Sequence, residues 1–202
     1  MSNKNAGGPQ LIRLESQLSR SRELVWSGYA VFIWSIAYMI PHLYWALGGT
    51  IGMSILKPSV LELPQWELIN WLASAFLTVA GFLGIALIYF GNSKPLKWLL
   101  LTITLAGSSV AASHGIYGII YRLLQIAGVV NLESGLFNVN EHAFVLWDLL
   151  LFEPWFLIEG ILLAVLGWCS FNKSSERRIW LILCTFGIII GLVTGLIGVR
   201  FA

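Results

Sequence analysis

"INWLASAFLTVAGFLGIALIYF", residues 69–90, contains no charged side chain. A helix needs about 20 apolar residues to cross the ~30 Å hydrocarbon core of a bilayer, so this stretch predicts a membrane span. Four similar runs occur elsewhere, and the expected spans are residues 24–47, 69–90, 98–121, 143–171 and 179–199. The predicted fold class is all-α: a polytopic membrane helix bundle with five transmembrane helices.

The composition supports the same class. The chain has 202 residues, of which 57% are hydrophobic and 11% charged, whereas a soluble domain carries roughly 25% charged residues. The formal net charge of +2 is too small to suggest binding to nucleic acid. We therefore expect membrane lipids as surroundings and no nucleic-acid partner.

The basic residues predict an orientation. The N-terminal arm and the connections before residues 98 and 179 hold nine of the 12 Lys and Arg residues: Lys4, Arg13, Arg20, Arg22, Lys94, Lys97, Lys173, Arg177 and Arg178. The opposite side holds Lys57, Arg122 and Arg200. Cytoplasmic loops carry the excess of basic residues, so the N-terminus is expected in the cytoplasm and the C-terminus outside.

Two domains are expected: an arm over residues 1–23 and a five-helix transmembrane domain over residues 24–202. The first apolar run is too long for the core of a signal peptide, so we expect a retained anchor. Apolar residues at helical spacing among arginines make the arm either an amphipathic helix on the inner leaflet or a loose basic segment. Residues 48–65 form a long apolar outer connection, which is expected to fold inward as a lid.

Small residues indicate where helices pack closely. Gly187, Gly191 and Gly195 form a doubled G-x-x-x-G in the fifth span, a spacing that lets a neighbouring backbone approach. The third span is rich in Gly, Ser and Ala, and the second contains Gly81 and Gly84. These three spans are expected to form a tight scaffold, and no chemistry is expected in the fifth span.

Carboxylic acids in the fourth span raise the functional question. Asp148, Glu153 and Glu159 lie within an apolar run, and a charge at the bilayer centre costs about 2.5–3.5 kcal/mol on insertion scales. On an ideal helix, Asp148 and Glu159 share a face, and Glu153 points about 140° from Asp148. Pro154 lacks an N–H and is expected to kink the helix between them.

Histidines and aromatic residues are expected at the same depth, in the outer half of the bilayer. Together with the acids they predict a pocket whose possible catalytic residues are Asp148, Glu153, Glu159, His114 and His42. Its expected lining residues are Trp34, Tyr38, Trp45, Tyr117, Tyr121, Phe152 and Trp155. Other interpretations stay open: Trp45 as an interfacial aromatic, the outermost histidines as water-facing groups, and the acids as a network that only holds helices together.

Two motifs carry a family resemblance. "HLYWALGG", residues 42–49, and "LWDLLLFEPWFLIEG", residues 146–160, resemble a family of small bacterial multi-pass membrane proteins known only as a domain of unknown function. The resemblance implies a bacterial inner-membrane protein and brings no activity with it.

The predicted pocket suits proton-donating chemistry. A carboxylic acid among apolar groups favours its protonated form, and aromatic faces stabilise a cation by about 2 kcal/mol or more when desolvated. In architecture and composition the chain is similar to membrane-bound terpene cyclases and emopamil-binding sterol isomerases, although no motif aligns. We therefore expect an acid-catalysed cyclase or isomerase of an isoprenoid or lipid alkene, with Asp148 or Glu153 as acid and no cofactor.

Two alternatives remain. Intramembrane acids and histidines also mark proton-coupled transporters, and in a transporter Glu159 would matter most. A protein that binds a lipid or another small hydrophobic molecule is grouped with this alternative. A metal enzyme is less favoured because neither H-x-x-x-H nor H-E-x-x-H spacing occurs. The sequence does not predict an oligomeric state.

Overall fold

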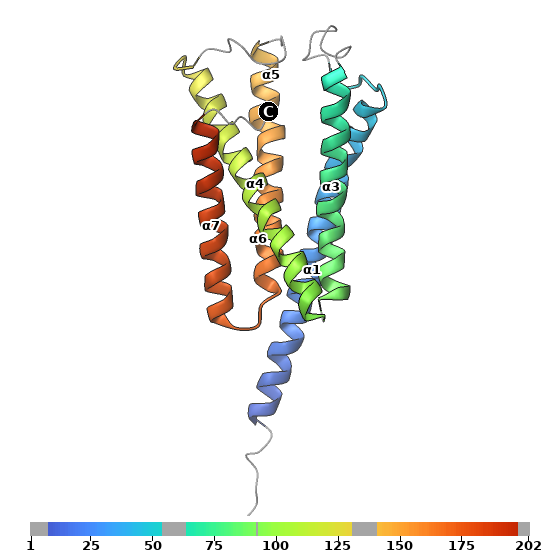
Figure 1. The fold of residues 1–202 in the computed structure, drawn as a ribbon, viewed down its shortest axis with the longest axis vertical. Helices are drawn as coiled ribbons and strands as arrows, with labels where there is room; N and C mark the ends of the chain where they lie inside the picture. The colour runs from blue at the N-terminus through green and yellow to red at the C-terminus, as the bar shows by residue number, and fades with distance from the viewer. Residues whose placement is uncertain (1–7, 54–63, 92, 131–140, 198–202) are drawn as a thin grey trace, which may run out of the picture.

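A computed structural model describes residues 8–53, 64–91, 93–130 and 141–197. In these ranges the chain forms upright helices that pack side by side as a bundle (Figure 1). The helices are α1 (Gly8–Ala46), α3 (Pro64–Phe90), α4 (Lys94–Ile126), α5 (Glu141–Trp147), α6 (Glu153–Cys169) and α7 (Ser174–Leu196), with a π-helical segment, η2 (Asp148–Phe152), between α5 and α6.

Five of the described segments are long and apolar enough to cross a membrane: Arg22–Ala46, Pro64–Phe90, Lys94–Ile126, Phe144–Cys169 and Ser174–Leu196. The predicted fold class and the five spans are confirmed. The fourth span combines parts of α5, η2 and α6. Helix α1 already begins at Gly8, so the described part of the N-terminal arm continues the first span as one helix.

The outer surface is apolar, as a helix bundle in lipid requires. Large side chains face outward on every span, including Phe76 at 72%, Leu150 at 73% and Phe186 at 60% exposure. A soluble protein rarely exposes so much contiguous apolar surface. Lipid chains would cover these residues, and the interior combines buried leucines such as Leu87, Leu101 and Leu166 with small and polar groups.

The helices form two groups. Helix α1 packs mainly on α3, and α4 packs on α6 and α7. The groups meet where α1 contacts α6 and where α3 contacts α4. The expected scaffold of the second, third and fifth spans is therefore wrong in one respect, since the main partner of α3 is α1. The physical reason is a glycine pair: a Cβ on Gly84 would overlap the carbonyl group of Gly28.

The glycine groove of α7 is confirmed, and its partner is α4. Cβ atoms on Gly187 and Gly191 would overlap the hydroxyl groups of Ser109 and Ser113. At the next position of the repeat, a Cβ on Gly195 would lie 3.1 Å from the Tyr117 ring. Small residues on both helices thus permit the close approach that the spacing predicts.

The first part of the outer connection folds back onto α1. Gly48 and Gly52 have φ angles of +86° and +83°, which favour glycine. The indole Nε1 of Trp45 donates to the Ile51 carbonyl oxygen at 3.0 Å. The remainder of the expected lid, residues 54–63, lies outside the described residues.

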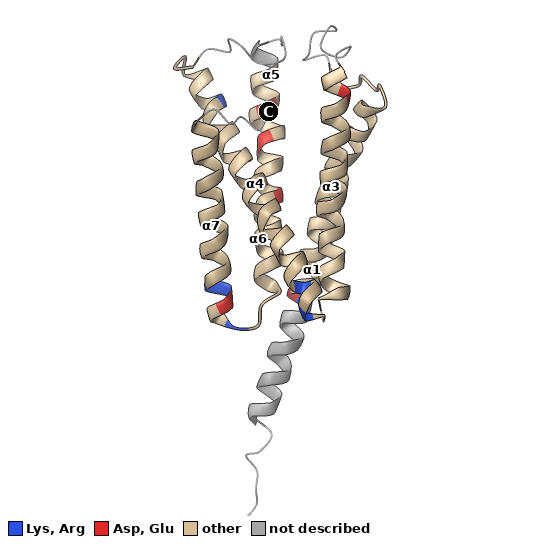
Figure 2. Cartoon of the chain, in the orientation of Figure 1, with Lys and Arg blue, Asp and Glu red and all other residues tan. Residues whose placement is uncertain are grey.

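The orientation gives a direct test. The N-terminal ends of α4 and α7 lie at the same end of the bundle, where basic residues gather (Figure 2). If the positive-inside rule applies, a reporter inserted between Lys94 and Lys97 will be cytoplasmic and one fused after Ala202 will be external. Paired phosphatase and fluorescent-protein fusions measure both positions. Two reporters on the same side of the membrane would contradict the five-span topology.

Candidate active site

A π-helical turn precedes Pro154 and sets the direction of the acids. Over η2 the backbone forms i→i+5 hydrogen bonds, and the N–H of Glu153 donates to the carbonyl oxygen of Asp148. Pro154 has no N–H to donate, and a π-turn is one way for a helix to accommodate such an interruption. The irregularity expected at Pro154 thus takes the form of a wider turn on its N-terminal side.

This turn corrects the ideal-helix assignment of faces. Asp148 and Glu153 were expected about 140° apart, but the extra residue in the turn places both against α4, where their partners are Arg122 and His114. Glu159 faces α1 instead, where Ser35 is its partner. Two acids therefore lie at one helix interface and the third at another.

Asp148 is held in an ion pair. Arg122 Nε donates to its Oδ2, and the two side chains are only 15% and 10% exposed. Arg122 also donates to Gln125 Oε1 at 2.7 Å and lies over the rings of Phe144 and Tyr121, at 4.9 and 5.6 Å from the ring centroids. Removing one partner of such a buried pair leaves an uncompensated charge, so this pair is suited to a structural role.

Glu153 is buried differently. Its residue exposure is 7%, and its carboxyl group lies against Gly118, where a Cβ would overlap it. Glu153 Oε2 is 3.7 Å from His114 Nε2 and makes no hydrogen bond within the described residues. The His114 ring packs against Phe156 at a centroid distance of 4.5 Å. Buried polar atoms almost always have a hydrogen-bond partner. This unpaired oxygen therefore indicates that the carboxyl group carries a proton or binds a ligand.

Glu159 is also buried, at 3% exposure, and lies at the α1–α6 interface. The Ser35 hydroxyl is 2.7 Å from Glu159 Oε1 and 2.8 Å from the Val31 carbonyl oxygen. A hydroxyl has one hydrogen to donate. When Ser35 donates to Val31, the Glu159 carboxyl must itself be the donor to Ser35 and therefore carry a proton.

Three of the predicted lining residues form one aromatic stack. Trp155 of α6 stacks on two α1 residues, with centroid distances of 4.1 Å to Trp34 and 4.9 Å to Tyr38. Trp34 Nε1 donates to the Trp155 carbonyl oxygen at 3.2 Å, and Trp155 Nε1 is buried without a partner among the described residues. Tyr38 also meets Phe156 edge-on at 5.5 Å, so the stack adjoins the ring that covers His114.

His42 lies at the outer end of the same α1 stripe. Asn70 Nδ2 donates to the Trp66 carbonyl oxygen at 2.8 Å, which turns Asn70 Oδ1 toward His42 Nδ1 at 2.9 Å. Nδ1 must then be the donor, and in the neutral ring Nε2 is an acceptor. This Nε2 is buried and has no partner in the described part of the chain. His42 also meets Tyr38 and Trp45 edge-on, at 4.8 and 5.3 Å.

The other predicted lining residues have different neighbours. Tyr117 and Tyr121 stack on each other at 6.0 Å, and Tyr117 lies against Gly195 of α7. Phe152 is half-buried at the end of η2. Trp45 is 6.4 Å from Trp66 and contacts the outer connection.

Sequence reasoning missed three residues of the site: Ser35, Asn70 and Phe156. Asn70 carried a usable signal, because an amide inside an apolar span commonly bonds across helices. Ser35 lies directly beside Trp34 in the aromatic stripe. The role of Phe156 depends on which helix lies opposite, so its position in the sequence carries no comparable signal.

Neither of two cavities in the described part of the chain is lined by Asp148, Glu153 or Glu159. One, of about 100 Å³, lies where α1 ends and α3 begins, between Trp45, Trp66 and Glu67. The other, of about 150 Å³, lies between α4 and α7. Within the described ranges, no three His, Cys, Asp or Glu side chains come together as a metal site.

Comparison with known proteins identifies a family only. A family model described as "Protein of unknown function (DUF3995)" matches residues 35–163, which include α3, α4 and the acids of the fourth span. No curated protein matches the chain. No solved structure matches it either.

Glycine substitutions on α4 should separate the packing of α4 on α6 from the positioning of the Glu153 carboxyl. In Gly115→Ala the new Cβ would meet the backbone of Leu157 and Glu153, which cannot yield, so the free energy of unfolding should fall by about 1–3 kcal/mol. In Gly118→Ala it would meet the movable carboxyl end of Glu153, so stability should change less while the carboxyl moves away from His114. Thermal unfolding in detergent and the infrared carboxyl band measure the two effects.

Gly107→Ala is the matched control on the same helix, since its Cβ would lie 3.2 Å from a methyl group of Leu163. Equal destabilisation by all three substitutions would contradict this packing of α4 on α6.

Proposed function

Since the chain belongs to the DUF3995 family, whose description assigns no activity, we propose a function from the geometry: an intramembrane enzyme that protonates the double bond of an isoprenoid or similar lipid. The observation that carries the proposal is Glu153, a buried acid with an unpaired oxygen beside His114 and Phe156. The proposed location is the bacterial inner membrane, where such a substrate is dissolved.

Glu153 is the proposed acid because the other two carboxyl groups are better paired. Asp148 is bound to Arg122. Glu159 Oε1 has Ser35 as its partner, while its Oε2, like that of Glu153, is buried without a partner among the described residues. An ionised carboxylate with a buried, unpaired oxygen is strongly unfavourable, so Glu153 is assigned the proton that it delivers. We assign His114, whose Nε2 is 3.7 Å away, to orient the carboxyl group and, after turnover, to pass to Glu153 the proton that the catalytic base has taken from the substrate.

Protonation of an alkene forms a C–H bond and leaves a carbocation on the neighbouring carbon. The faces of Trp155, Trp34 and Tyr38 are the groups that would stabilise this charge, by about 2 kcal/mol or more for a desolvated ring. These rings lie against one another, so the substrate must displace part of the stack. Loss of a proton from the cation then gives an isomer, and attack by a second double bond gives a ring.

A base is available for the isomerisation. His42 Nε2 is an acceptor without a partner in the described residues, and its ring contacts Tyr38 of the stack. We assign it the proton that leaves the cation. The substrate gains one proton and loses another, so the product is an isomer of equal mass and no cofactor is needed.

A second function is favoured by a separate observation. The acids occur at successive levels along one span, from η2 into α6 (Figure 2). A series of intramembrane acids is typical of proton-coupled carriers. In this alternative, protons pass from Asp148 by way of Glu153 to Glu159, and a solute moves with them.

The enzyme proposal predicts that Glu153→Gln abolishes turnover. Glutamine keeps the size of the side chain but has no carboxyl proton, so the rate should fall by about 10²–10⁴-fold while substrate binding persists. Purified protein is incubated with a panel of isoprenoid lipids, and isomers are sought by chromatography and mass spectrometry. Glu67→Gln changes a carboxyl group other than those of Asp148, Glu153 and Glu159, and it should retain the wild-type rate. An E153Q variant with full activity would contradict the assignment.

The aromatic stack gives a prediction about products. Trp155→Leu removes the ring that both α1 residues stack on, so a cation loses about 2 kcal/mol of stabilisation. Turnover should slow by about 30-fold or the ratio of products should change, as chromatography measures. An unchanged rate with an unchanged product ratio would remove the stack from the mechanism.

Transport is distinguished by a different readout. A proton-coupled carrier would take up solute into proteoliposomes along a pH gradient, and Glu159→Gln would uncouple uptake from that gradient. The enzyme proposal expects no such uptake. Gradient-driven uptake together with an unchanged lipid panel would replace the enzyme by the carrier.

A further inference from the structure

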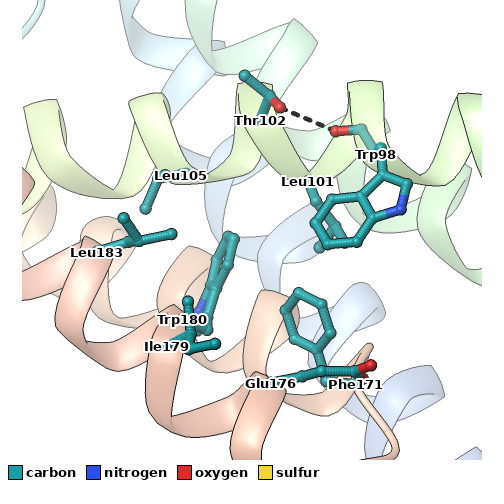
Figure 3. Close-up of a pocket in the computed structure, with 9 residues that line it drawn as sticks. All are labelled: Trp98, Leu101, Thr102, Leu105, Phe171, Glu176, Ile179, Trp180 and Leu183. Carbon is teal, nitrogen blue, oxygen red and sulfur yellow. Dashed lines mark hydrogen bonds between the residues drawn. The ribbon is translucent and has the colours of Figure 1, made fainter.

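The cavity between α4 and α7 is separate from the proposed active site. It has a volume of about 150 Å³ and lies near the ends of the helices that carry Lys97 and Lys173. The side chains around it are mainly large and apolar: Trp98, Leu101, Thr102, Leu105, Phe171, Glu176, Ile179, Trp180 and Leu183 (Figure 3). An engineered apolar cavity of about this volume stays dry and binds benzene.

The side-chain polar groups of this lining are already used, apart from the Glu176 carboxyl and the indole N–H of Trp98. Thr102 Oγ1 donates to the Trp98 carbonyl oxygen at 2.9 Å (Figure 3). Trp180 Nε1 donates to the Ala164 carbonyl oxygen at 2.8 Å. Glu176 lies 3.8 Å from Lys173, and both are partly or largely exposed. The inner wall therefore offers contact to a hydrocarbon and no hydrogen bond to a polar ligand.

The position of Lys97 indicates what kind of hydrocarbon fits. Its Nζ donates to the Ser170 carbonyl oxygen at 2.6 Å and lies 5.8 Å from the centre of the Phe171 ring, which lines the cavity. An ammonium group has three hydrogens, so Lys97 retains donors for an anion. Leu105 is eight residues further along α4, about 12 Å deeper at 1.5 Å per residue. The charge thus lies toward the membrane surface and the apolar wall toward the bilayer centre.

This order of groups is that of a phospholipid. We propose that the cavity holds a segment of one acyl chain of a phospholipid from the surrounding bilayer, and that Lys97 binds its phosphate. Basic sites between transmembrane helices commonly bind lipid headgroups in this way. Trp98, which lines the cavity and is 54% exposed, lies next to Lys97, at the depth where interfacial tryptophans are found.

Photolabelling of the full-length protein tests the proposal. Nanodiscs of phosphatidylethanolamine and phosphatidylglycerol are doped with a phosphatidylethanolamine that carries a diazirine in the middle of one acyl chain. After irradiation, peptide mass spectrometry should locate the adducts mainly on residues 98–105 and 179–183. Equal labelling of every lipid-facing helix would overturn the proposal. A cross-link between two copies of the chain through these residues would assign the cavity to an interface instead.

Variants test the two ends of the site. Lys97→Gln keeps a donor for Ser170 but removes the charge, and labelling of this region should fall about fivefold, the effect of one basic residue near a lipid surface. Leu105→Trp fills the cavity and should abolish the regional labelling. Val110→Trp is the matched control, because it adds the same ring to an outward position of α4 that is 54% exposed.

Labelling that neither Lys97→Gln nor Leu105→Trp changes would contradict the site. If either variant fails to fold, the labelling map of the wild-type protein decides the proposal alone.

Discussion

The close backbone approach of α4 and α6 determines how the Glu153 carboxyl lies beside His114 in the candidate site. Gly160 meets the backbone of Ala112, and Gly115 meets the backbone of Leu157. Lipid supplies no hydrophobic force between helices, so the association depends on such van der Waals contact and on hydrogen bonds like that of Ser108 to the Gly160 carbonyl oxygen, at 2.8 Å. At this separation the carboxyl of Glu153 occupies the space that Gly118, without a Cβ, leaves open.

The spans and the places of close packing could be predicted because both depend on local sequence. A run such as residues 69–90 predicts a span whatever surrounds it, and the spacing of Gly187, Gly191 and Gly195 marks one helix face. The partner of each face is a property of the whole bundle. The pairing of α3 with α1 through Gly84 and Gly28 therefore became known only from the structure.

The acids of the fourth span were expected inside the bundle, as the structure has them, but the helix faces on which they lie were not predicted correctly. Helical periodicity assumes 3.6 residues per turn, and the π-turn at Asp148–Phe152 breaks that assumption where the assignment of faces depended on it. Ser35 and Asn70 were missed for a different reason. The role of an isolated Ser or Asn in an apolar run depends on the group across the helix interface. That group is Glu159 for Ser35 and His42 for Asn70.

The π-turn lets the fourth span hold one residue more than a regular helix of the same length. Removing one residue between positions 148 and 152 would let the helix close with ordinary i→i+4 bonds. Asp148 and Glu153 would then be four residues apart, about 40° around an ideal helix, and both would still face α4. Homologous chains can accordingly differ by one residue in this stretch and keep both acids on the same helix face.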